Sequence, residues 1–396
     1  MLLLVAVGIA TLYGIGHPAE SSGVKISEDM SGFWKKQVIF AVVGLVGFIA
    51  VNLPNYREFG AGSYWIYIVL LILLGVLLVS RYFIKLPFAP ELNGSNRWIS
   101  FSVGGHSLPA IQPSEFCKLG YIIALAWYLR YRSNYRRFRS LIGPFVLTLL
   151  PMVMILAEPD LGTTILMMPV FFTMLFVAGA KAKHLIMVML LAVLVSPVMW
   201  FKMNSYQRKR ISSVLLQSKW LREKAENTPK LGQLLVGDKF TTKKWMNDWG
   251  YHLRRSKFAI ASGGLTGYGY RKGPFIKYDF LPYRYNDFVF SSFAHQWGFL
   301  GCLALLSLYV VIVLCALAII ENNTDPFGKL MCVGIICMFV VEVLVNISMT
   351  VGLMPITGLT LPFISKGGSS LVVSMMAIGL LNNVGRCRPF TVAPKM

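Results

Sequence analysis

The sequence is poor in charge, and above all in negative charge. Only 14% of its 396 residues are Asp, Glu, Lys or Arg, against about 25% in an ordinary soluble domain. This excludes a soluble globular enzyme, because too few polar side chains are available to cover one. It also argues against a nucleic-acid-binding protein, because basic chains of that class are not so apolar.

Cysteine and recognisable cofactor motifs are scarce as well. All six cysteines lie outside the long polar segment 204–287, so no disulfide is expected there. The five histidines are scattered without metal-ligand spacing. No P-loop, HExxH motif, convincing internal repeat or low-complexity tract occurs.

What the sequence does have is apolar bulk and positive charge. Hydrophobic residues make up 56% of the chain, and 38 Lys and Arg face 17 Asp and Glu, for a formal net charge of +21. A strongly apolar and strongly basic chain indicates an integral membrane protein that works near anionic headgroups.

Ten apolar runs have the length of membrane-spanning helices. The sequence therefore predicts one all-α polytopic membrane domain over residues 1–396. The predicted spans are 1–16, 34–53, 62–84, 112–130, 141–157, 161–180, 184–203, 289–319, 327–351 and 366–385.

Basic residues in short loops predict the orientation of these spans. They cluster after the fourth span, after the sixth span and in the tail 386–396, which places these three segments and both termini in the cytoplasm. The loop with Glu158 and Asp160 then faces outward. These basic residues are Arg130, Arg132, Arg136, Arg137, Arg139, Lys181, Lys183, Arg386, Arg388 and Lys395.

Because successive spans cross the membrane in opposite directions, the polar segment 204–287, a large loop between spans seven and eight, is placed outside the cell. Loops longer than about 60 residues largely escape the positive-inside rule. The many Lys and Arg of this segment are therefore permitted there, but topology does not explain them.

Two polar pairs lie inside predicted spans, where charges are costly. Glu115 and Lys118 are three residues apart and share a helix face. The spacing alone favours an internal ion pair, and the alternative is a cationic site for an anionic ligand. For Glu342 and Asn346, a buried polar contact between the two is favoured over a catalytic role.

Three further positions at span boundaries have a structural and a functional interpretation. Asp160, before Leu-Gly-Thr, is a plausible helix N-cap. Arg208 and Arg210 form either an interfacial anchor or a grip on lipid phosphate. Asp287 is either an N-cap together with Asn286 or a general base at the outer interface.

Two glycine pairs permit a close backbone approach and can form anion-binding nests, although tight turns explain them equally well. The first pair is Gly263 and Gly264. The second, Gly367 and Gly368, is flanked by Ser365 and Ser369.

In their order along the chain, these segments resemble the SEDS family (RodA, FtsW and SpoVE), glycosyltransferases of cell-wall peptidoglycan, and they look closer to RodA. The resemblance runs from the first span to Asn383. The segments that carry it are 94–99, 112–118, 159–163, 206–211, 256–264, 281–282, 287–288 and 352–370.

The resemblance implies ten spans and polymerisation of lipid II, a disaccharide-pentapeptide on undecaprenyl diphosphate. Asp287 matches the essential aspartate of the family. The positions that match its conserved polar cluster are Arg97, Glu115, Lys118 and Asp160.

We expect the reaction to invert the anomeric centre, with Asp287 as the base. Lys118, Arg97, Arg208 and Arg210 would neutralise the diphosphate, and Glu115 and Asp160 would orient Lys118. Mg²⁺ or Mn²⁺ is compatible with this chemistry, but no ligand cluster in the sequence requires a metal. The family also implies a class B penicillin-binding transpeptidase as partner.

The chain departs from the family pattern at Asn286, usually Thr, and at His295-Gln296, usually Glu-Glu. It departs again at Lys366, usually Tyr, and at Glu158, usually Gln; residues 215–247 look like an insertion. Two other functions stay open: a lipid II flippase with Glu115, Lys118 and Glu342 along its path, or a non-catalytic scaffold for a transpeptidase.

Overall fold

The computed structural model describes residues 1–19, 32–90, 96–100, 102, 103, 106, 107, 110–131, 138–203, 205–278 and 280–387. Of the segments discussed above, residues 94, 95, 204 and 279, the loop residues Arg132, Arg136 and Arg137, and the tail residues 388–396 lie outside the described residues. Within the described part the regular structure is helical, apart from a two-residue ladder of β1 (Ser102–Val103) and β2 (His106–Ser107) and an isolated bridge between Ile99 and Ile111. The prediction of an all-α fold is confirmed.

Each of the ten apolar runs coincides with one helix. Five of these helices, α3, α5, α16, α17 and α18, are long and apolar enough to cross a membrane, and the count of ten crossings stays a prediction. The ten helices are α1 (Leu2–Gly16), α3 (Phe33–Asn52), α5 (Ser63–Tyr82), α6 (Pro113–Leu129), α7 (Ile142–Ala157), α8 (Leu161–Val177), α9 (Ala182–Lys202), α16 (Val289–Asn322), α17 (Pro326–Val351) and α18 (Gly368–Arg386).

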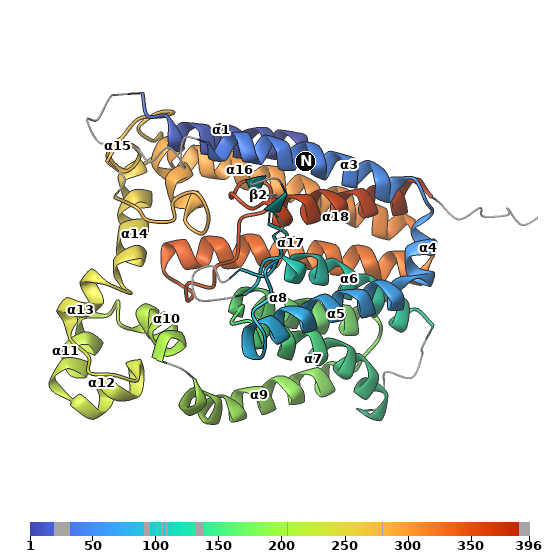
Figure 1. The fold of residues 1–396 in the computed structure, drawn as a ribbon, viewed down its shortest axis with the longest axis horizontal. Helices are drawn as coiled ribbons and strands as arrows, with labels where there is room; N and C mark the ends of the chain where they lie inside the picture. Colours follow the sequence, from blue (N-terminus) through green and yellow to red (C-terminus); the bar gives the residue numbers. More distant parts are fainter. Residues whose placement is uncertain are drawn as a thin grey trace, which may run out of the picture.

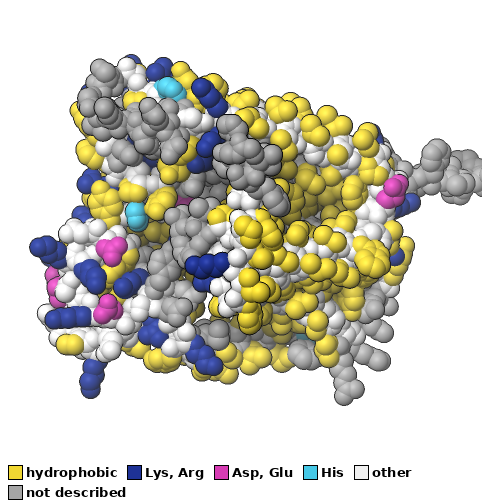
Figure 2. All heavy atoms as spheres, in the orientation of Figure 1, with side chains coloured by type: hydrophobic (Ala, Val, Ile, Leu, Met, Phe, Trp, Pro, Cys, Tyr) yellow, Lys and Arg dark blue, Asp and Glu magenta, His cyan; other side chains and the backbone are white. Residues whose placement is uncertain are grey.

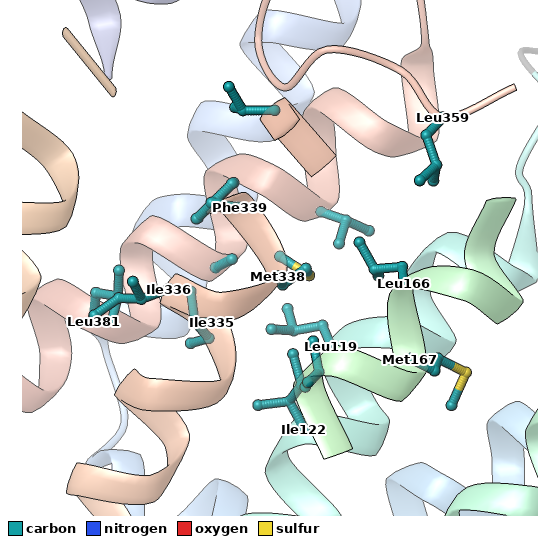
Figure 3. Packing of buried hydrophobic residues seen from close by; sticks show 14 of the residues in the cluster. Leu119, Ile122, Leu166, Met167, Ile335, Ile336, Met338, Phe339, Leu359 and Leu381 are labelled. Atoms are coloured by element: carbon teal, nitrogen blue, oxygen red, sulfur yellow. The ribbon is translucent and has the colours of Figure 1, made fainter. Parts of the chain in front are cut away.

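Helix α17 lies at the centre of the bundle and packs against α6, α8, α14, α16 and α18. Figure 3 shows part of this core, where Leu119 and Ile122 of α6 and Leu166 of α8 meet Ile335 and Met338 of α17. Leu119 and Ile122 are three residues apart, as are Ile335 and Met338, which puts each pair on one helix face.

The outside of the bundle is apolar, as lipid requires. In Figure 2, hydrophobic side chains cover the broad right-hand part of the visible face, and Lys and Arg gather at the left. Helix α9 is the extreme case, because Leu190, Val193 and Leu194 are 63%, 68% and 75% exposed.

Short elements close the two ends of the bundle. Helix α4 (Tyr56–Ala61) and the 3-10 helix η1 (Phe138–Leu141) lie at one end. We call it the Asp325 end, after the residue that caps α17 there, and the opposite end the Asp287 end (right and left in Figure 1).

The polar segment after α9 is a folded helical unit at the Asp287 end. It has its own small core, which includes Leu216, Val236 and Trp245. Trp200 Nε1 donates to Leu234 O at 2.9 Å and joins this core to α9. The helices of the segment are α10 (Ser205–Leu215), α11 (Lys219–Asn227), α12 (Pro229–Val236), α13 (Thr242–Asn247), α14 (Tyr251–Gly263) and α15 (Pro274–Lys277).

Candidate functional site

Asp287 lies in the turn before α16, half-buried, with its backbone held from α17. Asn346 Nδ2 donates to Asp287 O at 3.2 Å and to Leu359 O at 2.7 Å. Helix α16 begins at Val289 with Phe288 as its N-cap and no side-chain capping bond. Neither Asn286 nor Asp287 is therefore a side-chain cap, and that structural interpretation fails.

The segment that follows α17 wraps around this turn. Ser365 Oγ donates to Asn286 O and Lys366 N donates to Tyr285 O, both at 2.8 Å. Gly358 has φ +82°, and a Cβ placed on it would lie 3.8 Å from Asp287 Oδ2. A left-handed turn at glycine thus brings the backbone up to the carboxylate.

Lys366, which stands where the family usually has Tyr, still makes aromatic contacts. Its Nζ lies 3.2 Å from the centroid of the Phe33 ring and 5.1 Å from that of Tyr285. The cation therefore packs onto α3 and onto the Asp287 turn.

The surroundings of Asp287 raise the pKa of its carboxyl group to about 6. Burial is the main cause, and the positive charges of Arg210 and Arg97 partly oppose it. The group is therefore largely ionised at pH 7 and sits close to the pH at which a base works best.

Arg97 and Asp160 together fix the turn between α7 and α8. Arg97 Nε donates to Glu158 O at 2.7 Å, and Arg97 Nη2 donates to Pro159 O. Asp160 caps α8 by accepting from Thr163 N at 3.2 Å, as predicted.

The Asp160 carboxylate also reaches the start of α6. Asp160 Oδ2 accepts from Ser114 Oγ at 3.2 Å and from Gln112 Nε2 at 3.4 Å. Ser369 Oγ accepts from Gln112 N at 2.9 Å, which adds the start of α18 to the same cluster.

Lys118 is buried between two carboxylates. Its Nζ lies 2.7 Å from Glu115 Oε2 and 2.6 Å from Glu342 Oε1. The predicted contact with Glu115 is present. The second carboxylate, however, is Glu342 of α17 rather than Asp160, and Asn346 bonds to the backbone instead of to Glu342.

Glu158 is fully buried beside Asp160. Neither carboxylate oxygen has a hydrogen-bond partner among the described residues. Burial, and then the negative charge of Asp160, raise the pKa of Glu158 to about 8, against the opposing charges of Arg97 and Arg81. An unpaired carboxyl group is costly here in its ionised form.

The two arginines of α10 have different surroundings. Arg208 Nη2 donates to Phe201 O at 2.7 Å and so covers the carbonyl end of α9. Arg210 contributes positive charge at Asp287. The structure thus gives Arg208 a structural contact and places Arg210 in the electrostatic field of the candidate base.

The two glycine pairs also differ. A Cβ on Gly263 would collide with Ala294 O, and Gly264, at φ +55°, accepts from Phe299 N at 2.9 Å. This pair packs α14 closely against α16. A Cβ on Gly368 would collide with the Phe40 ring, and Gly367 precedes α18 in extended conformation.

Among the described residues, no group of three or more His, Cys, Asp or Glu side chains is placed to hold a metal ion.

Sequence reasoning recognised most of these residues but missed two contacts. It did not pair Glu342 with Lys118, and it did not connect Asn346 with Asp287. The available signal was a charged residue inside an apolar span, four residues before an amide.

Comparison with known proteins identifies the family of this chain. The family model described as FTSW_RODA_SPOVE, cell cycle protein, matches residues 1–388. "Peptidoglycan glycosyltransferase RodA" of Treponema pallidum is 31% identical, over 97% of this chain and 95% of its own. "Stage V sporulation protein E" of Bacillus subtilis is also 31% identical, over 97% and 94% of the two chains.

Solved structures give the same result. A chain from a study of the structural coordination of polymerization and crosslinking by a peptidoglycan synthase complex is 28% identical, with a TM-score of 0.73 over 97% of this chain and 96% of its own. The rod shape determining protein RodA of Thermus thermophilus is 26% identical, with a TM-score of 0.63 over 98% and 94%. The chain is thus a multi-pass membrane protein that belongs to the FtsW/RodA/SpoVE family of cell cycle proteins.

Proposed function

We propose that the chain is a peptidoglycan glycosyltransferase of a bacterial cytoplasmic membrane that polymerises lipid II into glycan strands. The observation that carries this proposal is the half-buried Asp287, whose pKa is about 6 and which lies in the field of Arg97 and Arg210. A carboxylate with nearby cations suits transfer from a diphosphate-linked donor, because one group accepts a proton while the others attract the leaving group.

In this mechanism Asp287 takes the proton from the acceptor sugar's 4-hydroxyl as that oxygen attacks the donor's anomeric carbon. The bond from this carbon to the diphosphate breaks, and the configuration inverts. Lys118, Arg97 and Arg210 neutralise the departing lipid diphosphate. Base catalysis of this kind contributes about 10²–10⁴-fold to the rate.

The Asp287 end faces outward in this proposal, and both termini lie in the cytoplasm. A class B penicillin-binding transpeptidase crosslinks the product. The similar structure of a synthase complex that couples polymerization and crosslinking supports a partner of this kind.

The test is a polymerisation assay with purified protein and lipid II. We expect wild type to form glycan strands and Asp287→Ala to form none while it melts as a folded protein. Full activity of the folded Asp287→Ala variant would contradict the assignment.

A flippase is the second candidate function, because Glu115, Lys118 and Glu342 form a buried charged group between α6 and α17. Lipid II in sealed vesicles separates the two functions. Movement of the lipid across the bilayer without glycan formation favours the flippase. The absence of both glycan formation and lipid movement, even with a transpeptidase added, favours a scaffold.

A further inference from the structure

One lysine in the middle of the bundle forms ion pairs with two carboxylates. Lys118, Glu115 and Glu342 are 2%, 10% and 2% exposed, with both Nζ–oxygen distances below 3 Å. One carboxylate is enough to balance one ammonium. A second buried carboxylate adds desolvation cost and excess negative charge. Charge balance therefore does not explain Glu342.

Glu115 and Glu342 constrain Lys118 in different ways. Glu115 stands three residues before Lys118 on α6, so the two side chains move together with that helix. Glu342 comes from α17. It is the carboxylate that fixes the ammonium relative to a different helix.

The same face of α17 also holds the candidate base. Asn346 follows Glu342 by four residues, about one helical turn. Its side-chain amide donates to Asp287 O and to Leu359 O. A single continuous helix thus carries one contact to the lysine and one to the backbone of the aspartate.

We propose that Glu342 is a positioning residue that holds Lys118 at a fixed separation from Asp287, with α17 as the common support. The inference rests on the proposed function, in which Lys118 receives the diphosphate and Asp287 the proton. An ammonium has three donors, and Lys118 Nζ donates one hydrogen bond to Glu342 Oε1 at 2.6 Å.

The experiment measures kcat, KM and thermal melting of the full-length chain with lipid II. The variants are Glu342→Ala, Glu342→Gln, Lys118→Met and the double variant Lys118→Met/Glu342→Ala. Glu321→Gln is the matched control, because it removes the same charge from an exposed position at the far end of α16.

We expect kcat to fall about 100-fold in Glu342→Ala, as for a misplaced catalytic group. In Glu342→Gln, which keeps a neutral acceptor oxygen, we expect a fall of about tenfold, with KM within about threefold in both. The double variant should be no slower than Lys118→Met, because a residue that acts through the lysine has no effect once the lysine is gone. Glu321→Gln should equal wild type.

Two results would overturn the inference. The first is wild-type kcat in folded Glu342→Gln, which decides the question even if Glu342→Ala does not fold. The second is an equal loss from Glu342→Ala in the presence and absence of Lys118. Either result leaves the proposed function intact if wild type polymerises lipid II, whereas failure of wild type with added transpeptidase would count against the function itself.

Discussion

The two ends of the bundle treat buried polar groups differently. At the Asp325 end, Asn383 Oδ1 accepts from Tyr56 N at 3.2 Å, and Asn383 Nδ2 donates to Val51 O at 2.6 Å and to Pro54 O at 2.8 Å. Unpaired buried atoms also occur at the Asp325 end, where Ser63 Oγ and Asn323 Nδ2 have no hydrogen-bond partner among the described residues, but the carboxylates with unpaired oxygens, Glu158 and Glu342, lie towards the Asp287 end.

This difference separates polar groups that hold the fold together from groups available for chemistry. Buried polar groups in proteins are normally paired, and unpaired ones call for an explanation. Functional sites commonly keep such unfavourable arrangements at a cost in stability. Removing polar groups at the Asp287 end should therefore cost activity more than stability, and the reverse should hold at the Asp325 end.

The largest expected effect on the comparison between the two ends comes from Asp287→Asn. Activity should fall about 10²–10⁴-fold, since the base is lost. The effect on stability has the opposite direction, because the variant should be more stable than wild type at high pH. The folded pKa of about 6 exceeds the ordinary value of 3.8, so the group's contribution to stability is present below pH 3.8 and is lost as the pH rises through 6. Asn cannot ionise.

Asp287→Asn should therefore melt higher than wild type at pH 8, with the gap closing towards pH 4. Melting curves at both pH values, beside a lipid II polymerisation assay, measure the two effects. A variant that melts lower than wild type at pH 8 would show that the carboxylate stabilises the fold.

The next effect belongs to the Asp325 end. Asn383→Ala removes three hydrogen bonds to the backbone, besides the one that Asn383 Oδ1 accepts from Cys387 Sγ at 3.3 Å, and it takes this partner from the Tyr56 N–H and two carbonyl groups. Each unpaired buried group costs about 1–3 kcal/mol, so we expect unfolding to become about 3 kcal/mol easier. The specific activity of the folded fraction should be unchanged.

The neighbouring Asn382 provides the control for that prediction. It is exposed and donates one bond, to Asn52 Oδ1 at 2.9 Å. Asn382→Ala should change the melting temperature much less. Equal destabilisation by the two alanine variants would mean that burial does not set the cost at this end.

A smaller, pH-dependent effect is expected from Glu158→Gln at the Asp287 end. The folded pKa of Glu158, about 8, lies above the ordinary value of 4.5. The contribution of this carboxyl group to the stability of the folded protein is therefore present below pH 4.5 and is lost as the pH rises through 8. The Gln variant should lie close to wild type near pH 5 and be more stable at pH 9, by up to about 1.4 kcal/mol for each unit by which folding raises the pKa.

Melting temperatures at pH 5, 7 and 9 test the Glu158 prediction. Glu321→Gln is again the control, because Glu321 is exposed at the far end of α16. A gap between Glu158→Gln and wild type that does not grow with pH would show that the carboxyl group is not the cause.

The apolar sequence pattern predicted the helices well because a membrane-spanning helix needs a long, continuous run of apolar residues, and such a run can be recognised in the sequence. All ten apolar runs became helices, and Asp160 is the N-cap that its neighbours suggested. Local patterns carry this information, since caps and helical periodicity depend on residues a few positions apart.

The contacts within the site were less predictable. Lys118 and Glu342 are 224 residues apart in sequence, and no local pattern indicates which of several carboxylates meets the lysine. The polar segment 204–287 was predicted only as a loop. Its helices and small core, with Trp245 among them, depend on packing between elements that are individually short and polar.

The smallest effect should come from the capping box of α4, which has six residues at the Asp325 end. The Asn55 side chain accepts from Arg57 N at 3.0 Å, and the Glu58 side chain accepts from Asn55 N at 3.3 Å. Loss of an N-cap costs about 1 kcal/mol, so Asn55→Ala should lower stability by about that amount, and Glu58→Ala by less.

Both α4 variants should keep full activity per folded molecule in the polymerisation assay. The bonds are exposed, so water replaces them when a side chain is removed, whereas the Asn383 side chain is fully buried. If Asn55→Ala destabilised as much as Asn383→Ala, α4 would be the anchor of that end. The difference in stability cost between the two ends would then depend on how α4 packs against the bundle, and not on the hydrogen bonds of the buried groups.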